Sequence, residues 1–173
     1  NFFANLYHYE SLDFNASTSV YDYEKDDFLD TVSASTIGVN SISATEADNK
    51  YLYDRPPLRF DSDDPELNIL KHNYDNQKIT VYGKLPKQAI KIPRYDHGTT
   101  TPDFIFKIEK DGEDPKYLMV ETKAENRRES DNQIVKIQEK YFEQLHESGI
   151  YYMMATSDQE VQEKLRRIQD GEE

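Results

Sequence analysis

The chain has 173 residues, and its 13 Tyr and 8 Phe residues provide enough apolar surface for one folded domain, which excludes wholesale disorder. It contains no cysteine, which excludes disulfides, thiolate nucleophiles and cysteine-ligated zinc. The net charge is -13, and neither a membrane-length apolar run nor a basic-then-apolar signal segment is present, so we expect a cytoplasmic protein.

Residues 1–60 are predicted to be an acidic extension rather than part of the core. The stretch 15–50 is rich in Ser, Thr, Asp and Asn and has only scattered apolar residues. Short strands are expected near 36–42 and 51–53, before consecutive prolines at 56–57 interrupt regular structure. We therefore divide the chain into this extension and a compact domain over 61–173.

The compact domain is predicted to begin with a short helix. Asp63 is an acidic N-cap, Pro65 lies in the first turn, and Glu66 follows Asp63 by three residues, as in a capping box. The apolar residues that follow are candidates for the buried face: Leu67, Ile69 and Leu70.

Several strands are expected next in the chain. Residues 79–82 and 89–92 are short strand-like stretches, and 103–108 has apolar residues at every second position. Asp111–Gly112 predicts a turn, after which the continuous apolar run 117–120 is typical of a central strand buried on both faces.

The last third of the chain predicts a helix, a strand and a second helix. The first helix begins at Ser130, with Gln133 completing a capping box, and ends at Gly149. Its predicted apolar stripe comprises Ile134, Ile137, Tyr141 and Leu145. A strand over 150–155 and a charged helix over 158–168 follow, so the element order predicts a mixed α/β fold with a central sheet flanked by helices.

Three charged residues lie where two predicted strands meet. Asp103 starts one strand, and Glu121 and Lys123 directly follow the apolar run of the next. If these strands pair as a hairpin, both carboxylates lie at its open end, and residues two apart on a strand share a face. Carboxylate oxygens suit Mg²⁺, and an ammonium group beside them can hold a water and offset charge on a phosphate. A solvated ion pair between Glu121 and Lys123 is the structural alternative.

The pairing of Pro102–Asp103 with Glu121-Thr122-Lys123 resembles the PD-(D/E)xK nuclease superfamily, and the closer likeness is to the C-terminal endonuclease domain of type III restriction enzyme Res subunits. The resemblance covers about residues 51–156 and implies a restriction-endonuclease-like core. Further pieces carry it: Tyr51-Leu52-Tyr53-Asp54-Arg55, Phe60-Asp61-Ser62-Asp63, Pro65–Glu66, Lys84-Leu85-Pro86 at the end of the first core strand, Ile90-Lys91-Ile92-Pro93, and Lys136–Ile137 with Tyr141–Phe142.

The resemblance implies roles for individual residues. Asp103 and Glu121 would be metal ligands for Mg²⁺ or Mn²⁺, with the main-chain carbonyl of Thr122 as a third ligand, and Lys123 would orient the attacking water. Glu66 matches an acid of the first helix that is often associated with the metal, although it also fits a simple helix cap. Four cations are expected DNA contacts: Lys136, Arg94, Arg127 and Arg128.

The same resemblance implies partners. A Res subunit carries an ATP-driven helicase motor and works with a methyltransferase subunit that recognises the DNA sequence. The chain has no G-x-x-x-x-G-K-[ST] loop, so ATP would act only through a motor domain preceding Asn1. The acidity also fits this arrangement: residues 1–66 hold 4 Lys or Arg against 14 Asp or Glu, whereas 78–140 hold 13 against 11. We expect the domain to bind DNA weakly by itself.

Three other interpretations remain open. One is a nuclease-like fold without activity that serves as a docking or DNA-binding module. Another is a repair or junction-resolving nuclease of the same superfamily. The third is a generic acidic α/β interaction domain, for which no metal-dependent behaviour is expected.

Overall fold

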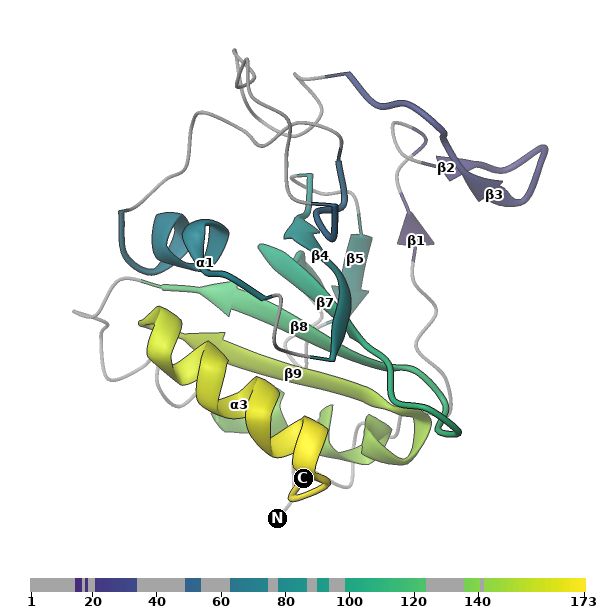
Figure 1. Cartoon of the computed structure of the whole chain (residues 1–173). Helices are drawn as coiled ribbons and strands as arrows, with labels where there is room; N and C mark the ends of the chain where they lie inside the picture. The colour runs from purple at the N-terminus through teal and green to yellow at the C-terminus, as the bar shows by residue number, and fades with distance from the viewer. Residues whose placement is uncertain are drawn as a thin grey trace.

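The structure is a computed structural model that describes residues 15–16, 18, 21–33, 49–53, 63–74, 78–86, 90–93, 99–123, 136–140 and 142–173. A four-stranded mixed sheet forms its centre (Figure 1). In spatial order, the strands are β4 (Ile79–Lys84), β7 (Phe104–Ile108), β8 (Lys116–Thr122) and β9 (Ile150–Ala155). The first three are antiparallel and β9 runs parallel to β8, which confirms the prediction of a mixed central sheet flanked by helices.

Two helical segments cover one face of this sheet. A π-helical turn at Asp63–Leu67 (η1) continues into α1 (Asn68–Lys71), and α3 (Asp158–Asp170) closes the chain, crossing the sheet in yellow in Figure 1. Ser157 caps α3 by accepting a hydrogen bond from the Glu160 amide, and Gly171 ends it in the left-handed conformation. The predicted final helix is confirmed with slightly wider bounds.

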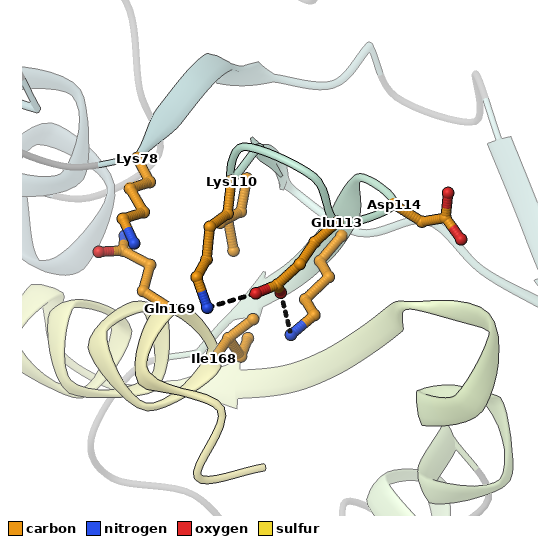
Figure 2. Close-up of a pocket in the computed structure, with 8 residues that line it drawn as sticks. Lys78, Lys110, Glu113, Asp114, Ile168 and Gln169 are labelled. Atoms are coloured by element: carbon orange, nitrogen blue, oxygen red, sulfur yellow. Dashed lines mark ion pairs between the residues drawn. The ribbon is translucent and has the colours of Figure 1, made fainter.

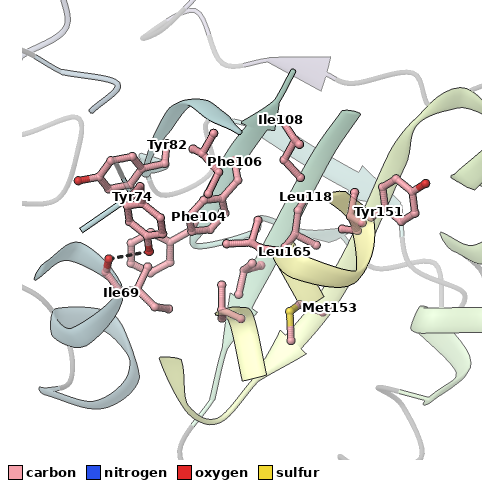
Figure 3. Packing of buried hydrophobic residues seen from close by; sticks show 14 of the residues in the cluster. Ile69, Tyr74, Tyr82, Phe104, Phe106, Ile108, Leu118, Tyr151, Met153 and Leu165 are labelled. Carbon is pink, nitrogen blue, oxygen red and sulfur yellow. Dashed lines mark hydrogen bonds between the residues drawn. The ribbon is translucent and has the colours of Figure 1, made fainter. Parts of the chain in front are cut away.

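The main core lies between this face and the helices (Figure 3). Every second residue of β7 points into it, so Phe104, Phe106 and Ile108 are buried as their alternation predicts. Tyr74 is fully buried among these rings, and its hydroxyl donates to the Ile69 carbonyl at 2.9 Å. The aromatic residues noted in the sequence therefore supply much of the core.

The opposite face contacts the helical residues 136–140 and 142, which we call the connecting helix, followed by the 3-10 helix η2 (Glu143–Ser148). Of the predicted apolar stripe, the described side chains include Ile137, which is half-buried, whereas Gln138 and Phe142 beside it are more deeply buried. The reason is that Phe142 stacks on Tyr152 of β9, with ring centroids 4.5 Å apart. Residues 134 and 141 lie outside the described residues.

Smaller pairings involve the first part of the chain. β1 (Asn15–Ala16) pairs with β5 (Ile90–Pro93), which in turn pairs with β6 (Thr99–Thr100). β2 (Tyr21–Asp22) and β3 (Asp27–Phe28) form a separate hairpin. The strand predicted over 36–42 lies outside the described residues.

Residues 50–52 run along the outer edge of β4. Tyr51 bridges Tyr82 in parallel, and the Leu52 amide donates to the Tyr82 carbonyl at 2.7 Å. This approach requires Gly83, because a Cβ there would lie 2.6 Å from the Leu52 Cβ. Tyr51 is itself buried in the core cluster and Tyr53 packs against it, so the prediction that residues 1–60 lie outside the core is wrong at these residues. The boundary at residue 60 stays a prediction. Among the described helices, none is long and apolar enough to cross a membrane.

Candidate active site

Asp103 and Glu121 lie at the same end of the β7–β8 pair. The strands are in register with Phe104 opposite Val120, and the Asp103 amide donates to the Val120 carbonyl at 2.8 Å. Asp103 therefore stands one position before Phe104, and Glu121 one position after Val120, at neighbouring places across the pair. The hairpin turn at Gly112 lies at the other end, as the sequence predicts.

The Asp103 carboxylate is held by β8. Its Oδ2 accepts hydrogen bonds from the Thr122 amide at 2.7 Å and from the Thr122 hydroxyl at 2.8 Å. Burial raises the pKa of Asp103 above its usual range, and the nearby Glu66 and Glu121 carboxylates add to this rise against the two Thr122 hydrogen bonds. Burial and the neighbouring carboxylates therefore destabilise the ionised form of Asp103, and a nearby cation would stabilise it.

The Glu121 carboxylate is surrounded by donors. Its Oε2 accepts from the Tyr152 hydroxyl at 2.7 Å and the Thr100 hydroxyl at 2.8 Å. Its Oε1 lies 2.9 Å from the Lys123 ammonium. Burial acts to raise the pKa of Glu121, but these hydrogen bonds together hold that pKa below its usual range. Glu121 is therefore kept ionised beside Asp103.

Lys123 is the most accessible group of this cluster, with 48% of its side chain exposed, whereas the Glu121 side chain is 14% exposed. Its main-chain amide donates to the Ala155 carbonyl at 3.0 Å, which ties the end of β8 to β9. The ammonium of Lys123 therefore lies between a buried carboxylate and solvent.

Glu66 lies close to the cluster but contacts different partners. Its Oε2 accepts from the Lys84 ammonium at 2.5 Å, and its Oε1 lies 3.4 Å from the Thr122 hydroxyl. Both Glu66 and Lys84 are buried. The chain of contacts therefore runs from Lys84 through Glu66 and Thr122 to Asp103.

Asp103 and Glu121 offer two hard oxygen ligands for a divalent cation. Within the described part of the chain, no three His, Asp or Glu side chains gather closely enough for a metal site. Mg²⁺ takes one or two carboxylates and completes its shell with water and substrate oxygens, so the pair fits such an ion. The convergence of the Asp103 and Glu121 carboxylates at the same strand ends, with Glu66 close to the Thr122 hydroxyl that binds Asp103, is the observation that favours a cation there.

Three contacts of this site went unrecognised in the sequence. Lys84 enters the sequence analysis only as part of Lys84-Leu85-Pro86, and the sequence gives no signal for Thr100 or Tyr152 as site residues. No spacing rule identifies them, because each reaches the site from a separate strand: β4, β6 and β9.

The expected DNA contacts are largely beyond what the structure describes. Arg94, Arg127 and Arg128 all lie outside the described residues. Lys136 lies in the connecting helix and is exposed to solvent.

A surface hollow at the other end of the hairpin contains none of the candidate residues (Figure 2). Lys110 and Lys116 both pair there with Glu113, beside Ile168 and Gln169 of α3. Ile108 and Lys116 of its lining mark the end of the β7–β8 pairing opposite to Val120. The hollow is therefore separate from the carboxylate cluster.

Comparison with known proteins identifies the class. A family model described as an endonuclease domain matches residues 49–159. The chain is also 48% identical, over 148 residues, to the type III restriction-modification enzyme StyLTI Res subunit of Salmonella typhimurium strain LT2. That alignment covers 86% of this chain and 15% of the relative. No solved structure matches.

The chain belongs to this endonuclease domain family. Its sheet and flanking helices form a restriction-endonuclease-like fold, and the domain resembles the cleavage domain of a type III restriction enzyme. The family resemblance expected from Pro102–Asp103 and Glu121-Thr122-Lys123 is thereby confirmed. A restriction endonuclease domain implies a divalent metal cation in general.

Proposed function

We propose that this chain is the Mg²⁺-dependent cleavage domain of a type III restriction enzyme and hydrolyses phosphodiester bonds of DNA. The observation that carries the proposal is the placement of Asp103 and Glu121 at neighbouring strand ends, with the Lys123 ammonium 2.9 Å from Glu121. The similarity to a Res subunit supports DNA as the substrate.

Asp103 and Glu121 would hold the divalent cation, with the Thr122 carbonyl as a third ligand. A bound Mg²⁺ would neutralise charge on the phosphate and favour an ionised water. Thr122 fixes Asp103, while Tyr152 and Thr100 fix Oε2 of Glu121. Lys123, being half exposed, is placed to hold the attacking water and offset charge on the phosphate. The water oxygen would form a bond to phosphorus as the water loses a proton to solvent, and the bond to the leaving oxygen would break as that oxygen takes up a proton from solvent.

Affinity and specificity would come mainly from neighbouring components. The net charge of -13 weakens attraction to phosphates. Lys136, Arg94, Arg127 and Arg128 are the proposed local DNA contacts. An ATP-driven helicase domain of the full-length enzyme and a methyltransferase subunit are the proposed partners that bring DNA to the site.

The test is nicking of supercoiled plasmid by the chain at high protein concentration and low salt, with Mg²⁺ or with chelator. Conversion to open circles in Mg²⁺ and none in chelator supports the proposal. Linear and branched DNA at the same concentration distinguish a junction-resolving enzyme, which would prefer the branched substrate. Equal nicking with and without metal would contradict metal dependence.

A further inference from the structure

Lys84 and Glu66 form an ion pair that is almost completely enclosed by protein. The Lys84 side chain is 9% exposed and the Glu66 side chain 6%, and their charged atoms lie 2.5 Å apart. Removing two charges from water is unfavourable unless each compensates the other. The two residues therefore act as a unit, and loss of one leaves the other as an isolated buried charge.

This ion pair adjoins the candidate metal ligands. Lys84 ends β4, where it pairs with Phe104 of β7, and the next amide, of Leu85, donates to the Asp103 carbonyl at 2.7 Å. On the other side, the Thr122 hydroxyl lies 3.4 Å from Glu66 and 2.8 Å from Asp103. The ammonium of Lys84 thus belongs to the same cluster as the carboxylates.

The charges of the cluster favour a single divalent ion. The carboxylates of Glu66, Asp103 and Glu121 and the ammonium groups of Lys84 and Lys123 have a formal sum of one negative charge. One divalent cation leaves a sum of one positive charge, and a second would leave three. A second ion beside Glu66 would also have to displace Lys84 or lie against its ammonium.

We propose that Lys84 is a built-in cation that occupies the place of a second metal ion at Glu66 and limits this site to one divalent ion. The inference rests on the proposed metal-dependent function and assigns Glu66 to Lys84 rather than to the metal. Lys84 then acts on the number of ions and not on the ligands themselves: its ammonium compensates the charge of Glu66, and Asp103 and Glu121 remain the two carboxylate ligands.

Calorimetric titration of Mn²⁺ into the metal-free chain tests this directly, because it counts bound ions without measuring cleavage. We expect one ion per wild-type chain. Lys84→Met keeps the aliphatic stem but removes the charge, so Glu66 becomes free to bind metal and a second ion is expected. The neutral pair Lys84→Met with Glu66→Gln avoids an isolated buried charge, and we expect it to bind one ion with an affinity within about threefold of wild type.

Each outcome decides a separate point. Two ions in the wild type, with one lost in the neutral pair, would overturn the inference and leave the metal-dependent function intact. A tenfold or greater loss of affinity in the neutral pair would make Glu66 a ligand and also overturn it, as would one ion in a folded Lys84→Met chain. If Lys84→Met folds only when Mn²⁺ is present, the number of ions bound by the neutral pair and their affinity provide the test instead. No Mn²⁺ binding by the wild type would contradict the proposed function itself.

Discussion

Thr122 donates both its main-chain amide and its side-chain hydroxyl to the same oxygen of Asp103, at 2.7 and 2.8 Å. The residue between Glu121 and Lys123 therefore fixes the carboxylate that comes from the neighbouring strand. This contact links Asp103 to the Glu121-Thr122-Lys123 segment. Any shift of β8 therefore moves Glu121, Lys123 and the Thr122 donors to Asp103 together.

Removing the Thr122 hydroxyl is expected to weaken metal binding and cleavage. Thr122→Val keeps the amide hydrogen bond but loses the hydroxyl, and outer-shell contacts of this kind are typically worth 10–100-fold in affinity or activity. We expect a loss of about tenfold in nicking rate and Mn²⁺ affinity. Thr122→Ser retains the hydroxyl and is the matched control. A Thr122→Val chain equal to wild type in both measurements would show that the contact has no effect on the site.

Tyr152 is expected to act through Glu121. Tyr152→Phe preserves the stack on Phe142 but removes the donor to Oε2, so Mn²⁺ affinity should fall by about tenfold. Tyr74→Phe removes a buried phenol that donates to the Ile69 carbonyl, so it should cost about 1 kcal/mol of stability and leave metal affinity unchanged. Calorimetry and urea denaturation separate the two effects. Equal loss of metal affinity in both variants would indicate a general structural effect.

Because Leu52 lies close to Gly83 of β4, a side chain added at position 83 is expected to be overpacked. Gly83→Ala places a methyl group 2.6 Å from the Leu52 Cβ, and overpacking of this kind costs about 1–3 kcal/mol. The midpoint of urea denaturation should fall accordingly. Adding Leu52→Gly removes the obstructing atom and should recover part of that loss beyond the effect of Leu52→Gly alone. Absence of any coupling between the two substitutions would mean that this edge contact does not form.

The raised pKa of Asp103 predicts how the stability of the metal-free chain depends on pH. Its pKa is higher in the folded state than the ordinary value of about 3.9, so the folded chain binds the proton more tightly. Stability contributed by protonated Asp103 is therefore present at low pH and is lost as the pH rises through the folded pKa. Glu121 has a lowered pKa and acts oppositely, since its contribution is lost on acidification.

Asp103→Asn isolates this effect. In chelator, we expect the variant to gain free energy of unfolding relative to wild type as the pH rises from about 4 to 7. Mn²⁺ at pH 7 should then stabilise wild type more than the variant. Denaturant titrations at the two pH values measure the difference. A constant difference at both values would contradict the raised pKa of Asp103.

Much of the fold could be predicted because its elements carry strong local patterns. The alternation in β7, the apolar run of β8 and the charged final helix each appear in the structure. The phase of the connecting helix could not be predicted, because the ring of Tyr152 determines that Phe142 and not Ile137 is buried most deeply. Periodicity alone does not contain that tertiary contact.

Some residues of the candidate site could likewise be predicted from the sequence, and others could not. Asp103, Glu121 and Lys123 could be predicted because strand pairing brings adjacent strand ends together. Lys84, Thr100 and Tyr152 could not, because their contacts arise from strands that are distant in sequence. Whether Glu66 caps a helix or joins the site also depends on the distant Lys84.

The central claim is tested most directly by Mg²⁺-dependent nicking of supercoiled plasmid by wild type, Lys123→Ala and Lys107→Ala. Lys107 is a matched control, because it also pairs with a glutamate two residues away at a strand end: Glu109, one residue past the end of β7, at 2.7 Å. We expect Lys123→Ala to lose at least about a hundredfold in rate, as a single electrostatic stabiliser of the transition state typically contributes, and Lys107→Ala to match wild type. Nicking by Lys123→Ala at the wild-type rate would contradict the active site described above.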